Sequence, residues 1–247
     1  MRIKSLKVQL SVFLFLFAGY LAVTDKDYFF LLSITVAIAA TVFTDSLFCY
    51  FKNKKITVTE SSIVSGLIIG FVLSPDTGLW LPAVAGIIAI FSKHILRWRK
   101  NHFLNPAAFG VLFSLFIFGF WFDTGTQWNG TYLWYFLVPA GIYFSYKMRK
   151  LEIIAGYYIV YFCCFGIQAF LQEMPISTIA MFANYFFILI MLVEPKTSPY
   201  TRWGKIIYGA SAAVIVFVLY FIGFKYDADL AALMICNAGS PLLNKLK

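Results

Sequence analysis

The sequence contains few charged residues. Asp, Glu, Lys and Arg together make up 13% of its 247 residues, whereas an ordinary soluble protein contains about 25%. Apolar residues make up 61%, so too little polar surface is available to cover a water-soluble fold, and a separate soluble domain is excluded. At about 20 residues per crossing, about ten helices would use most of the chain. The composition therefore predicts an all-α polytopic membrane protein.

Several motifs of soluble enzymes and of metal proteins are also missing. The four cysteines form no CxxC pair and no zinc or iron–sulfur spacing. Walker loops, GxGxxG turns and catalytic triads are absent as well, so we assign no catalytic residue and no metal site. The net charge of +9 comes from short basic clusters between apolar runs. This pattern is typical of cytoplasmic loops and argues against nucleic acid as a partner.

The apolar runs predict ten membrane helices, and the basic residues predict their orientation. All Lys and Arg residues except Lys26 and Lys225 fall in the segments that are cytoplasmic when the N-terminus is inside. We therefore expect a multi-pass protein of the cell (inner) membrane, with cytoplasmic N- and C-termini. The predicted helices cover residues 7–23, 28–50, 60–74, 79–96, 107–122, 131–146, 151–171, 176–194, 206–223 and 228–243.

Ten helices suggest a five-plus-five inverted repeat within a single membrane domain, 1–247, with halves of about 1–125 and 126–247. Transporter-like repeats of this kind often form a site from interrupted helices. Prolines and asparagines stand at paired positions of the two halves, and they free backbone groups that lipid cannot satisfy. We therefore expect helix breaks, and candidate cofactor-binding residues, at Ser74, Pro75, Asn105, Pro106 and Asn237, with a further break at Glu194-Pro195.

Ionisable residues in or near apolar segments are candidates for function, because burying them in a membrane is costly. Asp45, Glu60 and Glu194 are candidate residues of an ion pathway. Lys93 and His94 lie in a basic segment that would suit an anionic group such as a phosphate. Ser62, Gly66 and Gly70 share one helix face, which suits close helix packing or a flat ligand.

At these positions the sequence resembles the NqrB/RnfD family. This is the B/D membrane subunit of the sodium-translocating NADH:quinone reductase and of Rnf electron-transport complexes. The resemblance extends over nearly the whole chain and is carried by ESSIVSGLIIG at 60–70, LSP at 73–75, Lys93-His94, HFLNPAAFG at 102–110, EPKTSP at 194–199, Tyr208-Gly209, and the pattern of Asp229, Asn237 and Pro241.

The resemblance implies a ten-helix inverted repeat related to urea channels, and flavin-linked electron transfer coupled to Na⁺ or H⁺ translocation. Family members bind FMN covalently through the last threonine of an Asp-x-x-Ser/Thr-Gly-Ala-Thr motif. The nearest segment here, Asp123–Gln127, lacks the alanine and that threonine. We therefore expect no covalent FMN, and FMN or riboflavin held non-covalently.

The resulting hypothesis is a membrane subunit of an ion-translocating oxidoreductase that is not catalytic alone. Its expected partners are other membrane and flavoprotein subunits, the lipid bilayer and, as a further candidate, quinone. Two alternatives stay open from the sequence. One is a solute channel or transporter of urea-channel-like architecture without redox chemistry, and the other is a membrane scaffold for an extracytoplasmic flavoprotein.

Overall fold

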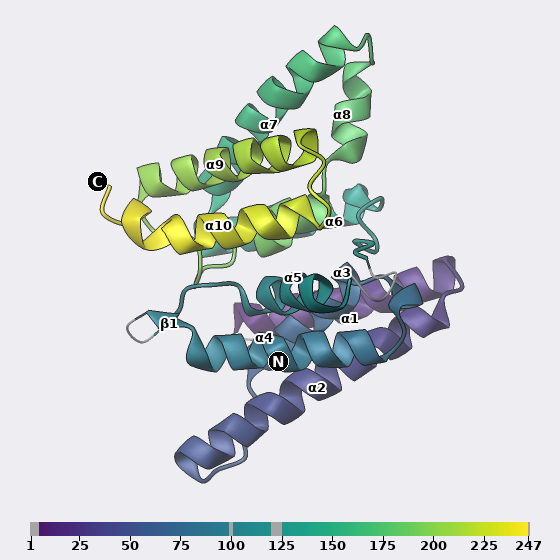
Figure 1. Ribbon diagram of the computed structural model, residues 1–247, viewed down its shortest axis with the longest axis vertical. Helices are drawn as coiled ribbons and strands as arrows, with labels where there is room; N and C mark the ends of the chain where they lie inside the picture. Colours follow the sequence, from purple (N-terminus) through teal and green to yellow (C-terminus); the bar gives the residue numbers. More distant parts are fainter. Residues whose placement is uncertain (1–4, 99–100, 120–124, 247) are drawn as a thin grey trace. The chain divides into compact units, whose positions relative to one another are not determined.

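The structure, a computed structural model, describes residues 5–98, 101–119 and 125–246. It is helical apart from one short hairpin and divides into two compact units, Met1–Asn129 and Gly130–Lys247 (Figure 1). The boundary lies four residues beyond the predicted end of the first half. The first unit contains α1 (Leu6–Thr24), α2 (Tyr28–Asn53), α3 (Glu60–Val72), the 3-10 helix η1 (Pro75–Thr77), α4 (Trp80–Ile95), β1 (Arg97–Trp98), β2 (Asn101–His102) and α5 (Pro106–Phe118).

The second unit repeats this order of helices, with one helix interrupted. It contains α6 (Trp134–Met148), α7 (Leu151–Leu171), α8 (Ile176–Phe182), the π-helix η2 (Phe187–Met191), α9 (Arg202–Phe221) and α10 (Ala228–Leu243). In the first unit α2 packs against α3 and α4, and α4 packs against α5. In the second unit α7 packs against α8 and α9, and α9 runs beside α10 (Figure 1). The shared pattern supports the predicted repeat of five helices.

In the part of the chain that the structure describes, four helices are long and apolar enough to cross a membrane: α1, α2 up to Lys52, α7 and α9. Shorter apolar helices, α3, α4, α5 and α10, pack against them. At about 1.5 Å per residue, α2 with its 26 residues is about 39 Å long, which exceeds a bilayer core of about 30 Å. The protein is therefore an all-α, multi-pass membrane protein, as the composition predicts.

Glycines allow the helices of the first unit to approach closely. A Cβ atom at Gly66 would lie 2.6 Å from Cα of Ile38, and one at Gly70 would lie 2.7 Å from Cα of Ile34. No side chain larger than hydrogen fits at these distances, so the small-residue face of α3 packs directly on α2. Of the two interpretations of the Ser62-Gly66-Gly70 face, the structure supports helix packing.

One predicted helix break is absent from the structure, and one predicted helix is broken where no break was predicted. The predicted break at Asn237 is wrong, because α10 is continuous from Ala228 to Leu243. Its Pro241 lies near the end of the helix, where few intrahelical bonds remain to be lost. The predicted helix 176–194 is instead interrupted at Ala183 and Asn184, and continues as the π-helix η2. The breaks after Leu73 and at Glu194-Pro195 occur where predicted.

Candidate functional site

A buried charge cluster joins three predicted site residues of the first unit. Asp45 lies in the C-terminal part of α2, and Lys93 and His94 lie in the last turn of α4. Lys93 Nζ is 2.9 Å from Asp45 Oδ1, and His94 Nε2 is 2.8 Å from the same oxygen. The hydroxyl of Thr59, the N-cap of α3, donates to Asp45 Oδ2. The Asp45 side chain is only 1% exposed, so Lys93 acts as its internal counterion.

The partners of His94 indicate which of its ring nitrogens accepts a hydrogen bond. Arg97 Nη2 is 3.1 Å from His94 Nδ1, and a guanidinium can only donate. Nδ1 is therefore the acceptor, and the proton lies on Nε2, which donates to Asp45. The imidazole also stacks on the ring of Phe48 at 4.5 Å. His94 is thus a hydrogen-bonding residue of the cluster, and the charge of Lys93 is paired with that of Asp45.

The other predicted residues of the first unit lie at helix ends. Asn105 is the buried N-cap of α5, and its Oδ1 accepts from the backbone N–H of Ala108 at 3.0 Å. Pro106 is the first residue of that helix, so both residues have a structural role there. Glu60 begins α3 and accepts a hydrogen bond from the hydroxyl of Ser5.

Ser74 and Pro75 follow the C-terminal end of α3. They lie next to residues 125–127, which belong to the segment whose sequence is most similar to the covalent flavin motif. The backbone N–H of Ser74 donates to Gly125 O at 3.1 Å, and Leu73 forms a β-bridge with Thr126. Residues 125–127 are therefore held against the end of α3. Asp123 and Thr124 lie outside the described residues.

The second unit contains the remaining two predicted residues. Asn237 is fully buried in α10, and its Oδ1 accepts from the Tyr208 hydroxyl at 2.6 Å. Its Nδ2 has no partner among the residues that the structure describes. Glu194 follows η2, and its carbonyl accepts from the N–H of Ser198 at 3.1 Å. The predicted site residues are thus divided between the units, and the structure joins only Asp45, Lys93 and His94.

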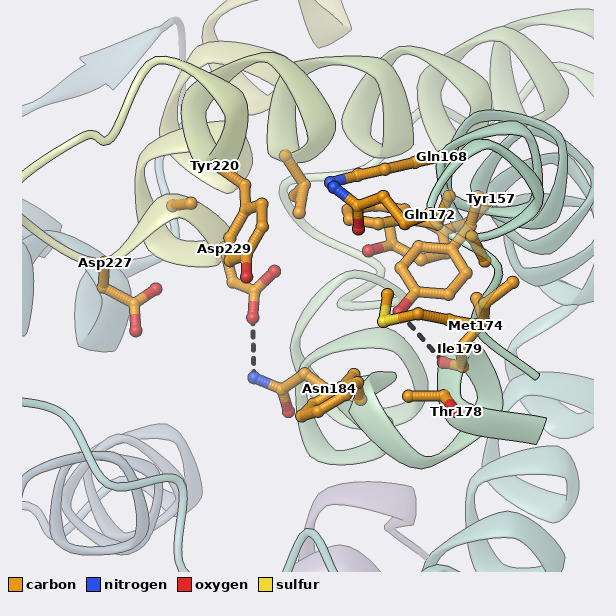
Figure 2. A pocket seen from close by; sticks show the side chains of 16 residues that line it. Tyr157, Gln168, Gln172, Met174, Thr178, Ile179, Asn184, Tyr220, Asp227 and Asp229 are labelled. Atoms are coloured by element: carbon orange, nitrogen blue, oxygen red, sulfur yellow. Dashed lines mark hydrogen bonds between the residues drawn. The ribbon is translucent and has the colours of Figure 1, made fainter. Parts of the chain in front are cut away.

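A pocket in the second unit was not predicted from the sequence. It has a volume of about 280 Å³ and lies among the C-terminal parts of α7 and α9, helix α8 and the start of α10 (Figure 2). Its lining combines aromatic rings with amides and two carboxylates, and contains no Lys, Arg or His. The lining residues are Tyr157, Tyr161, Phe165, Gln168, Ala169, Gln172, Met174, Thr178, Ile179, Phe182, Asn184, Val216, Tyr220, Asp227, Ala228 and Asp229.

Asp229 is the central polar group of this pocket. Its Oδ2 accepts from Asn184 Nδ2 at 2.7 Å (Figure 2). Among the described residues, no Lys, Arg or His forms an ion pair with it. Asn184 is positioned by the helix interruption, since its Oδ1 accepts from the N–H of Phe187 and from the hydroxyl of Thr131. The carboxylate therefore has an amide partner and no internal counterion.

Two further oxygens belong to the polar lining of the pocket. The hydroxyl of Tyr161 donates to Ile179 O at 3.2 Å (Figure 2). The Oε1 atom of Gln168 is buried and has no partner in the described part of the chain. An unpaired carbonyl oxygen and a carboxylate without a counterion are both acceptors, so the pocket suits a cation or a group that donates hydrogen bonds.

The sequence contained a signal for part of this site. Asp229 belongs to the pattern shared with the NqrB/RnfD family, and Asn184 is a polar residue in an apolar run. What the sequence did not show is that the run is broken at Asn184. The break turns the amide of Asn184 toward α10, where it reaches Asp229.

Comparison with known protein families confirms the resemblance found from the sequence. The model of the NQR2, RnfD, RnfE family matches residues 2–135 and 120–247. The chain belongs to this family. It is therefore a membrane subunit of an electron-transport complex and assembles with other subunits. No curated protein matches the sequence.

Proposed function

We propose that this membrane subunit takes part in flavin-linked electron transport that is coupled to movement of Na⁺ or H⁺. Family membership supports the electron-transport role. The distribution of Lys and Arg supports a location in the cell (inner) membrane with cytoplasmic termini. The observation that carries the coupling proposal is Asp229, a carboxylate in a pocket without an internal counterion.

A carboxylate in a membrane helix must be neutralised, because an isolated charge there is costly. Asp45 is neutralised by Lys93, so its charge is not available to a mobile ion. Asp229 has only the amide of Asn184 and must take up a proton or a cation from outside the protein. Asp229 is thus the best-placed carboxylate for coupling. Glu60 and Glu194 stay candidate residues of the ion pathway.

The pocket also allows the two expected flavins to be compared. A flavin supplies one- and two-electron chemistry when it is bound. The rings of Tyr157 and Tyr161 could stack on a flat ring system, and the Gln168 oxygen could accept from a ring N–H. The phosphate of FMN does not fit a lining that holds two carboxylates and no cation. Non-covalent riboflavin is therefore the flavin that this pocket suits better.

Cofactor content tests the redox part of the proposal. The protein is purified in detergent together with its partner subunits, and the flavin absorbance near 450 nm is recorded before and after acid precipitation. We expect flavin in the supernatant, identified as riboflavin by its lack of phosphate. Flavin that stays with the pellet would mean covalent attachment. A colourless protein would contradict the redox role and favour the channel or scaffold alternative.

Asp229→Asn tests the coupling part. The variant keeps the size of the side chain and one oxygen that can accept from Asn184, and it removes the charge. In proteoliposomes containing the complex, we expect electron transfer to continue while Na⁺ or H⁺ flux falls at least tenfold. Glu173→Gln, an exposed change in the nearby α7–α8 connection, is the matched control and should leave flux unchanged. Normal flux in Asp229→Asn would remove Asp229 from the pathway.

A further inference from the structure

The second unit contains a buried cation that has no carboxylate within ion-pair distance among the described residues. Lys150 is the residue before α7, and it is only 4% exposed. Its Nζ donates to the backbone carbonyls of Ser198, at 3.2 Å, and of Pro199. An ammonium has three N–H donors, and the third has no partner among the described residues. The two carbonyls reduce the cost of burial but cannot neutralise the charge.

A second buried lysine lies beside it. Nζ of Lys205 is 2.8 Å from Glu152 Oε1 and 2.8 Å from the carbonyl of Arg149. Lys205 and Glu152 neutralise one another, which leaves the charge of Lys150 in excess. Burial and the positive charge of Lys205 lower the pKa of Lys150 to about 8. Among the described residues, Glu152 is thus the carboxylate of a cluster that holds two lysines.

The surroundings also suit an anion at a membrane surface. The hydrogen bonds of Lys150 and Lys205 connect the start of α7 with the segment before and at the start of α9. Arg149 and Arg202 are exposed residues of these two segments. The hydroxyls of Ser145 and Thr197, in the same segments, are buried and without a partner in the described part of the chain. Lys150 is also the N-cap of α7, where the helix dipole favours negative charge.

We propose that the Lys150–Lys205 cluster of the second unit binds a phosphate group, either that of an anionic phospholipid headgroup or free phosphate. The bound anion would neutralise Lys150 and accept its third N–H, and Arg149 and Arg202 would make outer contacts. Exposed Tyr200 and Trp203 lie next to the cluster in sequence, and such residues are typical of the headgroup region of a membrane. The inference does not depend on the proposed redox function.

The experiment uses the protein in nanodiscs of phosphatidylcholine with increasing fractions of phosphatidylglycerol. Native mass spectrometry counts the phosphatidylglycerol molecules that stay bound after release. We expect one saturable site in the wild type. Lys150→Met should weaken it at least tenfold and Arg202→Gln about threefold. The control, Lys52→Gln with Lys55→Gln, removes two exposed charges, one from the last turn of α2 and one from the α2–α3 connection, and should have no effect.

A second arm identifies the source of the phosphate. Inorganic phosphate is titrated against phosphatidylglycerol binding in the same discs. Competition at millimolar concentration would show that the site accepts free phosphate, and lack of competition would assign it to the lipid headgroup. Equal retention of the two lipids by the wild type would overturn the proposal. The proposal would also be overturned if the Lys52→Gln, Lys55→Gln control lost as much phosphatidylglycerol binding as Lys150→Met. Unchanged phosphatidylglycerol binding in both Lys150→Met and Arg202→Gln would overturn it as well.

Discussion

The ion pair between Lys93 and Asp45 allows a sharp prediction about stability. Lys93→Met removes the ammonium and keeps a side chain of similar length. Asp45 would then stay buried with only Thr59 and His94 as partners. Removing one partner of a buried ion pair costs about 3–5 kcal/mol, because the other charge is left uncompensated. The two remaining hydrogen bonds place the expected cost at the lower limit, about 3 kcal/mol.

The assay is thermal unfolding of the purified protein in detergent. A loss of about 3 kcal/mol corresponds to a fall in Tm of roughly 6–12 °C for a chain of this size. The double variant Asp45→Asn with Lys93→Met should be more stable than Lys93→Met alone, because no unpaired charge is left. Lys52→Met, an exposed change at the end of the same α2 helix, should change stability by less than about 0.5 kcal/mol.

Two results would refute this reasoning. An unchanged Tm in Lys93→Met would show that the ion pair does not stabilise the first unit. A double variant that loses the sum of the two single effects would show that the residues are not coupled. The flavin content of the Lys93→Met variant shows whether Lys93 has a structural role or also binds the cofactor. We expect the folded Lys93→Met variant to keep its flavin, and loss of flavin at normal stability would restore Lys93 as a cofactor residue.

Three further predictions follow from other parts of the chain. Gly209→Ala would press a Cβ against the backbone carbonyl of Ile153 and should lower the free energy of unfolding by about 1–3 kcal/mol. Its control is Gly166→Ala, where a Cβ meets open space, and this variant should be neutral or slightly stabilising in the same thermal assay. The pKa of Lys150 is about 8 in the folded protein against 10.5 in water, so the unfolded state binds more protons between these values and stability should rise with pH. In neutral, phosphate-free detergent, wild type should therefore gain up to about 3 kcal/mol over Lys150→Met from pH 8 to 10.5, and a constant difference would contradict the assignment. Glu194→Gln should lower ion flux relative to electron flow in proteoliposomes, and unchanged flux would exclude Glu194 from the pathway.

The sequence predicted most of the helices, because membrane helices are long apolar runs bounded by polar residues. The bounds of α7 and α10 agree with the prediction to the residue. The break at Asn184 could not be predicted in this way, since no proline or glycine marks it within the apolar run. The opposite error occurred at Asn237, where a polar residue suggested a break. The Tyr208 hydroxyl satisfies its side chain inside a continuous helix.

The site was predicted less completely than the helices. Asp45, Lys93 and His94 were each identified, but as members of an ion pathway and of a cofactor site. Their pairing depends on the packing of α2 against α4, which brings together residues 48 positions apart in the chain. The buried carboxylate that pairs with Lys93 lies in another helix. Local sequence cannot show such a partner.

The carboxylates of Asp45, which is buried, and of Asp229, which is half-buried, are satisfied in opposite ways. Both polar sites involve the C-terminal parts of the second and fourth helices of a unit, but Asp45 lies on the second helix, α2, and Asp229 at the start of the fifth, α10. In the first unit Lys93 is the counterion, and because it is covalently attached it cannot leave Asp45. In the second unit no such lysine is present among the described residues, so the counterion of Asp229 must be exchangeable. A mobile ion requires a counterion position that can be emptied and refilled. We therefore expect Asp45→Asn to lower stability and to leave coupling intact. We expect Asp229→Asn to lower coupling and to leave stability intact.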